Sequence, residues 1–152
     1  MEKNTDKDSG AFELDHRLQS DCAHVGDLML CRVLLMKDAN YPWIVLVPKR
    51  EHVSEVYQLD TDDQEQLIWE SSFVAQCLAK EFSADKMNVA ALGNVVKQLH
   101  IHHVVRKHTD PAWPDPVWGR VAPRGYTSAQ LKDRVLRLQK AFQTSTFKPA
   151  EF

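Results

Sequence analysis

The stretch from Val95 to Val105, which reads VVKQLHIHHVV, decides the predicted fold. Its β-branched residues with interleaved histidines are typical of a strand. Successive side chains of a strand point to opposite faces, so Leu99 and Ile101 share one face, which we expect to pack beneath a helix. The opposite, accessible face then carries a row of nitrogen-bearing side chains, spaced about 7 Å apart. They are those of Gln98, His100 and His102.

The other predicted strands pair in sequence order. Residues 28–36 are almost continuously apolar and lead through a turn-forming segment into the β-branched and aromatic run 43–47, which predicts an antiparallel hairpin. Residues 87–92 form a further strand, and the turn Gly93-Asn94 joins it to the histidine strand. We therefore expect two hairpins in one antiparallel sheet.

Two helices are predicted from apolar residues that recur at helical spacing. The first spans 61–82, and Thr61 with Gln64 three residues later suggests a capping box at its start. The second spans 127–142. The expected fold is α+β, with two layers: an antiparallel sheet of about five strands, one long helix across it, and a C-terminal helix.

Between the histidine strand and the last helix lies a proline-rich segment, 110–119. Its prolines exclude a regular helix or a central strand, so the segment is either an irregular ordered loop or a disordered one. Trp113 and Trp118 favour order, because large aromatic side chains need apolar partners.

The composition limits the class of protein. The chain has 152 residues, 43% of them hydrophobic, which is enough for the core of a single domain. Its net charge of −2 argues against a general nucleic-acid binder. Cys22, Cys31 and Cys77 show no paired spacing, and there is neither a secretory signal nor a membrane-spanning apolar run, so we expect a cytoplasmic protein.

The histidine strand suggests nucleophilic chemistry at phosphorus. A neutral imidazole is a competent nucleophile once a fixed acceptor binds the proton on its other ring nitrogen, and the backbone carbonyl of Gln98 could orient His100 in this way. Two alternatives stay open: ordinary surface histidines, and a zinc site with His103 or His108. However, His103 points to the other face, and no nearby Cys or Glu completes a tetrahedral set. We predict no metal ligands and no cofactor.

Residues 88–118 resemble the histidine triad (HIT) family, whose signature is three histidines that alternate with hydrophobic residues. The resemblance implies a nucleotide hydrolase or transferase that acts at the α-phosphate of nucleoside phosphoramidates or dinucleoside polyphosphates, with His100 as the nucleophile. Two positions depart from the signature: Gln98 replaces the first histidine, and His103 replaces a hydrophobic residue. Val95 occupies the place where many relatives carry a serine, so the leaving-group preference is open.

The resemblance also covers the hairpin, the turn Pro48-Lys49 and the long helix. It implies a HIT-like domain over 12–120. The polar and charged start of the chain predicts a flexible N-terminus over 1–11, and the pattern after the domain predicts a C-terminal helical extension over 121–143 and a flexible tail over 144–152.

The family also suggests roles for further residues of the expected site. A nucleotidyl-histidine intermediate would form on His100, with His102 and Asn88 stabilising phosphoryl oxygens and Gln98 assisting. Asp38, at a hairpin end, is the candidate for the ribose hydroxyls, with Asn40 competing for that role. Two further substrate contacts are expected from turns and loops. They are Asn94 and Trp113.

The family implies a homodimer with a nucleotide substrate. The main alternative is a catalytically weak nucleotide-binding or regulatory module on the same fold, and a histidine-bound metal protein is a third possibility.

Overall fold

A computed structural model describes residues 12–151, so the expected flexible N-terminus over 1–11 lies outside the described residues. The elements in chain order are α1 (His16–Asp21), β1 (Cys22–Asp27), β2 (Cys31–Met36), β3 (Trp43–Pro48), the 3-10 helix η1 (Val56–Gln58), α2 (Thr61–Glu81), β4 (Lys86–Ala90), β5 (Ile101–Arg106), α3 (Ser128–Ala141) and β6 (Lys148–Pro149). The fold is α+β, as predicted. Within residues 12–151, no helix combines the length and the apolar character that a membrane span requires.

The strands form one sheet of six in the order β4-β5-β3-β2-β1-β6, and all neighbouring pairs are antiparallel. The two predicted hairpins are present as β2–β3 and β4–β5. The sequence predicted about five strands and located four of the six individually. The missed strands are β1 and the two-residue β6, which lies in the segment expected to be a tail.

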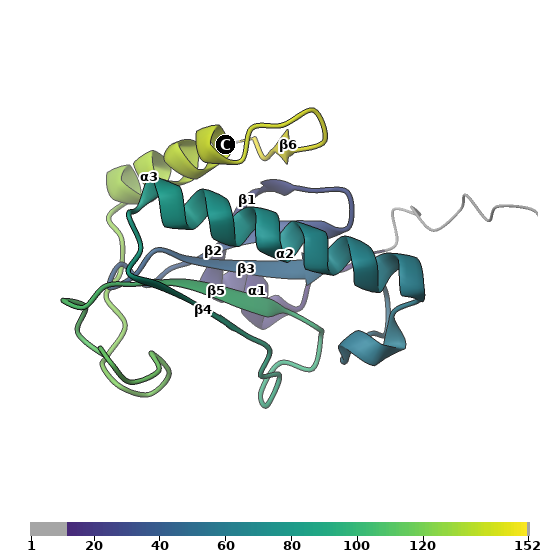
Figure 1. The fold of residues 1–152 in the computed structure, drawn as a ribbon, viewed down its shortest axis with the longest axis horizontal. Helices are drawn as coiled ribbons and strands as arrows, with labels where there is room; N and C mark the ends of the chain where they lie inside the picture. Colours follow the sequence, from purple (N-terminus) through teal and green to yellow (C-terminus); the bar gives the residue numbers. More distant parts are fainter. Residues whose placement is uncertain (1–11, 152) are drawn as a thin grey trace, which may run out of the picture.

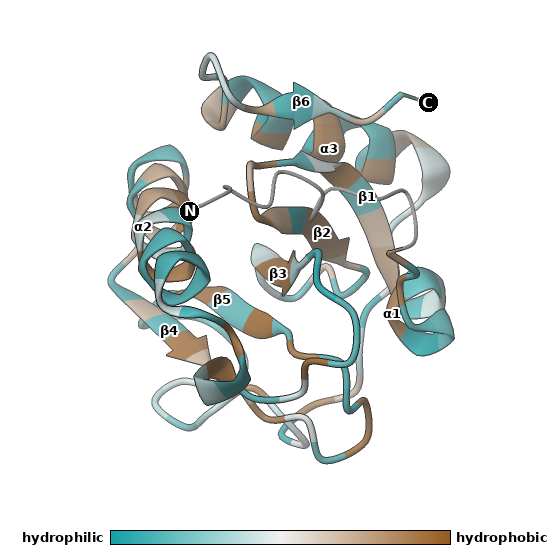
Figure 2. Ribbon diagram, turned by 90° about the vertical axis from the view of Figure 1, so that its right-hand side faces the viewer, coloured by the Kyte–Doolittle hydropathy of each residue, from teal (hydrophilic) through white to brown (hydrophobic). Residues whose placement is uncertain are grey.

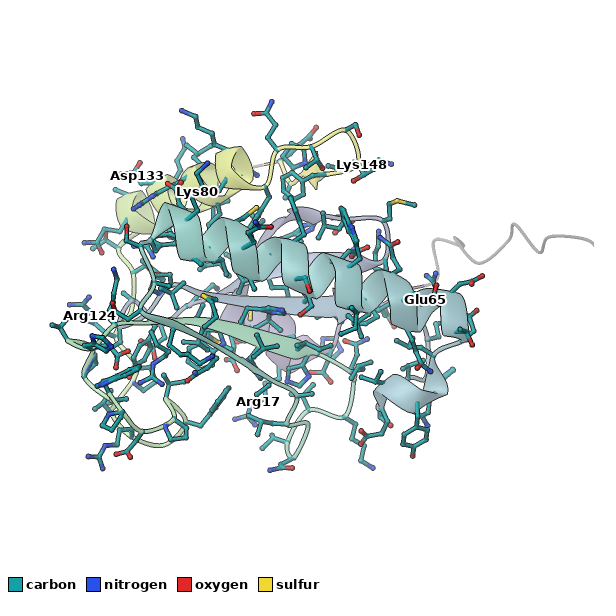
Figure 3. All side chains as sticks on the ribbon, viewed as in Figure 1. Arg17, Glu65, Lys80, Arg124, Asp133 and Lys148 are labelled. Carbon is teal, nitrogen blue, oxygen red and sulfur yellow. The ribbon has the colours of Figure 1, made fainter. Side chains whose placement is uncertain are left out.

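The sheet separates two apolar clusters. On one face, α2 and α3 pack against the strands through Leu67, Val74 and Leu138. On the other face, α1 contributes Leu18 to a smaller cluster with Trp43 and residues of the proline-rich segment. Figure 1 shows α2 and α3 together above the sheet, and the turned view of Figure 2 places α1 on its opposite side. Figure 3 labels charged side chains that lie around the outside of the molecule, among them Arg17, Glu65 and Lys80.

The histidine strand is shorter than predicted. The sequence predicted pairing from residue 95, but β5 begins at Ile101, and residues 95–100 are irregular. The difference arises because the backbone there bonds outside the sheet: the Leu99 N–H donates to the Val53 carbonyl at 2.9 Å. The alternation of faces is nevertheless as predicted, since Leu99 and Ile101 pack in the cluster beneath α2 and Val104 in the opposite one.

The two main helices begin close to where the sequence placed them. In α2 the N-cap is Asp60 and not Thr61, since the Asp60 carboxylate accepts the Asp63 N–H. In α3 the cap is a capping box that Thr127 and Gln130 form reciprocally. Acceptors at these positions satisfy backbone donors that have no partner inside a helix.

A buried carboxylate, which the sequence analysis missed, fixes α2 to the sheet. Glu70 is fully buried, and its two oxygens accept the backbone N–H groups of Leu30 and Cys31, each at 2.9 Å. A buried charge is tolerated where hydrogen bonds replace its hydration. The start of β2 is therefore tied to the middle of the long helix.

Candidate active site

His100 has the geometry of an oriented nucleophile. Its Nδ1 lies 2.7 Å from the backbone carbonyl of Gln98, so Nδ1–H donates and the lone pair remains on Nε2. This is the hydrogen bond that the sequence suggested. The side chain is only 7% exposed, and that of His102 only 5%, so the expected accessible face is wrong. The cluster around α1 covers the sheet here and leaves the two rings at the wall of a cavity.

His102 also makes its hydrogen bond through Nδ1, but there Nδ1 is the acceptor. The Trp43 indole Nε1–H donates to His102 Nδ1 at 3.0 Å, and the centroids of the two histidine rings are 5.0 Å apart. Burial, followed by the charges of His100 and His103, lowers the His102 pKa to about 3. His102 is therefore neutral at physiological pH.

Gln98 does not face these rings. Its side-chain oxygen accepts the Asp15 N–H and its amide nitrogen donates to the Glu13 carbonyl, both at 2.9 Å. This arrangement does not support the predicted assistance to the phosphoryl group, because backbone groups of Glu13 and Asp15 occupy both ends of the amide. Gln98 instead holds the segment that leads into α1.

We expect Gln98→Ala to affect substrate binding more than the chemical step. Loss of the two hydrogen bonds loosens the segment before α1, and α1 forms part of the cavity wall. The expected result in a steady-state assay is a KM raised about threefold to tenfold with kcat within about twofold of wild type. Gln76→Ala, on the exposed side of α2, is the matched control. A kcat reduced a hundredfold would instead give Gln98 a direct role in the chemistry.

His103 lies on the face beneath α2, as its phase with Ile101 predicted. Its Nε2 is 2.7 Å from the Ser71 hydroxyl of α2, and its Nδ1 is 3.1 Å from the Ile101 carbonyl. Burial lowers its pKa to about 4. The ring is a polar link between helix and strand, and it does not line the cavity of His100.

These two buried neutral histidines predict a dependence of stability on pH. Unfolded histidine titrates near 6.5, so below that pH the unfolded chain binds protons that His102 and His103 do not bind until pH about 3 and about 4. The free energy of unfolding should therefore fall with acidification between pH 6 and 4.5, approaching about 2.7 kcal/mol per pH unit for two protons. Urea titrations across this window measure the slope. His103→Val should remove about half of it, and an unchanged slope would contradict the buried, neutral state.

Two predicted substrate contacts belong instead to a separate buried cluster. The Asn88 side-chain oxygen accepts from Arg106 at 2.7 Å, and Arg106, only 1% exposed, forms an ion pair with Asp110 at 2.8 Å. The Arg106 guanidinium lies 5.5 Å from the ring centroid of Trp113. Asn88 and Trp113 thus pack around Arg106, and neither lines the cavities next to the histidines.

Two adjoining cavities lie at the histidines. The histidine pocket, about 380 Å³, is lined by His100, His102 and the segment 92–96, which includes the predicted Asn94. The Asp38 pocket, about 470 Å³, lies beside Asp38 and Lys37. Both pockets share four lining residues, which make them one continuous candidate site: Asp21, Met36, Trp43 and Trp118.

Of the two residues predicted to compete for ribose at the hairpin end, Asp38 lines a pocket and Asn40 does not. Asp38 lines its pocket, with one carboxylate oxygen accepting the backbone N–H groups of Asn40 at 3.0 Å and Arg124 at 3.2 Å. The Asn40 amide donates to the Ala122 carbonyl at 3.1 Å and lines neither pocket. Asp38 therefore remains a candidate contact, and the competing role of Asn40 is not supported.

Trp118, and not the predicted Trp113, lines both pockets. Its ring centroid is 5.7 Å from that of Trp43 and 5.2 Å from that of His102, in edge contacts. The sequence identified the loop but could not determine which indole turned inward. The contributions of α1, Leu18 and Asp21, were also missed, because six residues are too few for helical periodicity.

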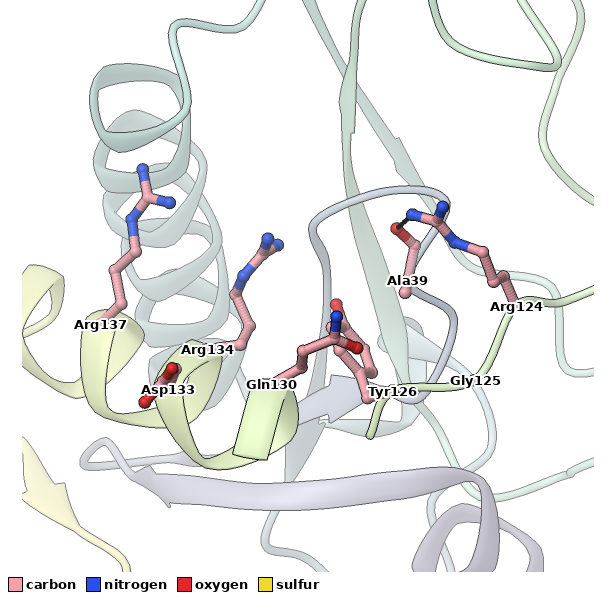
Figure 4. Close-up of a pocket in the computed structure, with 8 residues that line it drawn as sticks. All are labelled: Ala39, Arg124, Gly125, Tyr126, Gln130, Asp133, Arg134 and Arg137. Carbon is pink, nitrogen blue, oxygen red and sulfur yellow. Dashed lines mark hydrogen bonds between the residues drawn. The ribbon is translucent and has the colours of Figure 1, made fainter. Parts of the chain in front are cut away.

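A third cavity, of about 410 Å³, is lined by Arg124, Tyr126, Arg134 and other residues between the 38–40 turn and α3, shown in Figure 4. It contains no histidine. Its arginines have partners in the fold: Arg124 donates to the Ala39 carbonyl, and Arg137 forms an ion pair with Glu81. Neither His100 nor His102 lines this cavity. Among residues 12–151, no group of three His, Cys, Asp or Glu side chains is placed to hold a metal ion.

The antiparallel sheet, and the His100 ring that a backbone carbonyl orients at the wall of a cavity, agree with the family resemblance seen in the sequence. The family model of the HIT domain matches residues 17–109, and the chain belongs to the histidine triad family.

Solved structures agree with this assignment. A histidine triad protein from Marinobacter aquaeolei VT8 is 46% identical, with 86% of this chain and 96% of that chain covered and a TM-score of 0.84. One from Bradyrhizobium japonicum is 42% identical, with 87% and 98% covered and the same TM-score of 0.84. A histidine triad nucleotide-binding protein from Sulfolobus tokodaii strain7, at 17% identity and a TM-score of 0.61 over 80% of this chain and 83% of that chain, shares the fold. No match was found among curated proteins.

Proposed function

We propose that the protein is a nucleotide hydrolase or nucleotidyltransferase that acts at the α-phosphate through a nucleotidyl-histidine intermediate. The observation that carries the proposal is the His100 ring, whose Nδ1–H is bound to a carbonyl while Nε2 keeps its lone pair at a cavity wall. Members of the histidine triad family are nucleotide-binding hydrolases and transferases, and the Sulfolobus structure is that of a histidine triad nucleotide-binding protein.

The two pockets suggest how a nucleotide would lie. The base and ribose occupy the Asp38 pocket, where Trp118 and Met36 offer apolar contact and Asp38 accepts from ribose hydroxyls. The α-phosphate lies over His100 in the histidine pocket. Asn94 lines that pocket and can donate to the phosphate or to the leaving group.

The reaction would proceed by two displacements. His100 Nε2 attacks the α-phosphorus in line, a nitrogen–phosphorus bond forms, and the bond to the leaving group breaks as that group takes up a proton. In the second displacement water, or another acceptor, attacks the same phosphorus, the nitrogen–phosphorus bond to His100 breaks, and the attacking group loses its proton to solvent, which also supplies the proton taken up in the first displacement.

Turnover of adenosine phosphoramidate to AMP, followed by chromatography, tests the proposal. We expect AMP to form in proportion to enzyme. The second candidate is a binding or regulatory module, favoured by Val95, which lines the histidine pocket without offering a hydroxyl and is 70% exposed. AMP binding measured by calorimetry without any turnover of phosphoramidate or dinucleoside polyphosphate would support the module and contradict the enzyme.

A homodimer through the β4 edge is part of the proposal. Strand β4 ends the sheet, and its Val89, 50% exposed, pairs with His103 of β5. Ile68 of α2, 69% exposed, lies one turn before Ser71, which bonds His103, so both apolar side chains border the same edge. Light scattering should give the mass of two chains, and Val89→Lys should shift it to one chain.

The proposed compartment is the reducing cytoplasm. Cys22, Cys31 and Cys77 are all free thiols, and burial raises the pKa of Cys22 to about 12, which makes it unreactive.

A further inference from the structure

The two site histidines are held in opposite tautomers. The Gln98 carbonyl accepts from His100 Nδ1, so the free lone pair of His100 is on Nε2. The Trp43 indole has a nitrogen that can only donate, so the His102 Nδ1 that it contacts at 3.0 Å must be the acceptor. A neutral ring with an unprotonated Nδ1 carries its proton on Nε2. The site therefore pairs a nucleophilic nitrogen with an N–H donor, on rings 5.0 Å apart.

We infer that Trp43 is a positioning residue that fixes His102 with its Nε2–H available as a hydrogen-bond donor to a phosphoryl oxygen in the histidine pocket. That the acceptor is a phosphoryl oxygen rests on the proposed function. The tautomer of His102 is independent of that function, because it follows from the contact with Trp43.

The surroundings of His102 leave Trp43 as the group that fixes this tautomer. Trp118 contacts the His102 ring edge-on, with 5.2 Å between the ring centroids, and within residues 12–151 no hydrogen bond joins these two side chains. His100 uses its own Nδ1 on a carbonyl. Trp43 is itself held in place on β3 by edge contacts with two aromatic rings. Its ring centroid lies 6.3 Å from that of Tyr41 and 5.7 Å from that of Trp118.

A neutral donor suits this position for a physical reason. Protonation of His102 at Nδ1 would place that hydrogen against the indole N–H, so the Trp43 bond favours the neutral ring. The effect acts in the same direction as burial, which already lowers the His102 pKa. A donor oriented in advance stabilises charge that develops on a phosphoryl oxygen without reorganising during the reaction.

The nitrogen spectrum of the full chain tests the tautomer directly. In ¹⁵N-labelled protein without substrate, we expect His102 to show an unprotonated Nδ1 and a protonated Nε2, His100 to show the reverse, and a scalar coupling to cross the bond from Trp43 Nε1 to His102 Nδ1. In Trp43→Phe the ring bulk stays while the donor is lost, so the coupling should vanish and the His102 signals should shift. Trp118→Phe is the control, because it makes the same indole-to-phenyl change at another residue that contacts the His102 ring. It should leave the His102 tautomer intact.

Kinetics test the positioning role separately. Trp43→Phe should lower kcat for adenosine phosphoramidate by about tenfold to a hundredfold while KM changes by less than about threefold. A wild-type His102 protonated on Nδ1, His102 signals that do not change in Trp43→Phe, or an unchanged kcat in that variant would overturn the inference. If the wild type shows the expected tautomers but turns over no nucleotide, the proposed function fails while the tautomer assignment stands.

Discussion

Replacement of His100 by Ala is expected to reduce nucleotide turnover by at least about a thousandfold. The reason is that the substitution removes the one ring nitrogen, within residues 12–151, that combines a free lone pair, a fixed orientation and a position at the histidine pocket. Turnover of adenosine phosphoramidate and AMP affinity by calorimetry are the two measurements, and affinity should change little because the Asp38 pocket stays intact.

The burial of His100 requires a control for folding. The ring is only 7% exposed, so its loss enlarges the histidine pocket and can lower stability. A melting curve shows whether the variant remains folded at the assay temperature. His108→Ala, which removes an exposed histidine outside the pockets, is the matched control and should keep full activity. More than about a tenth of wild-type activity in folded His100→Ala would contradict the assignment.

The second large effect is expected from the same substitution at two tryptophans of one loop. Trp118→Ala should weaken AMP binding by about tenfold to a hundredfold, because the indole is a wall of both pockets and stacking on an aromatic ring contributes about 1–3 kcal/mol per base. Trp113→Ala should leave the affinity of the folded protein unchanged and lower the free energy of unfolding by about 2 kcal/mol, because Trp113 covers the buried Arg106.

Calorimetry with AMP and urea unfolding of both variants measure the two quantities. Each variant is the control for the other, since the chemical change is identical. Equal losses of affinity in both would contradict the division of the loop into a pocket wall and a structural clamp.

The sequence predicted the parts of the site that depend on strand periodicity. Alternation alone placed His100 and His102 on one face and His103 on the other, and the structure agrees. It also suggested the Gln98 carbonyl as the group that orients His100, because a backbone carbonyl is present whatever the side chain.

Contacts between segments far apart in the chain could not be predicted in this way. Gln98 bonds the backbone at Glu13 and Asp15, 85 and 83 positions away, and these bonds decide that its side chain leaves the site. Arg106 is the last residue of β5, yet the structure buries it in an ion pair with Asp110, and Asn88 and Trp113 pack around it. Trp43 looked like an ordinary strand residue, since its bond to His102 depends on the pairing of β3 with β5.

Mass spectrometry of the protein quenched in acid-free denaturant during turnover of adenosine phosphoramidate tests the central claim most directly. The account predicts an adenylyl adduct on one peptide, with fragmentation placing it on the His100 ring and its loss on further incubation with water. The adduct should be absent from His100→Ala. Turnover without a protein adduct, under conditions in which the first displacement is faster than the second, would contradict the account. An adduct on His102 or His103 would also contradict it.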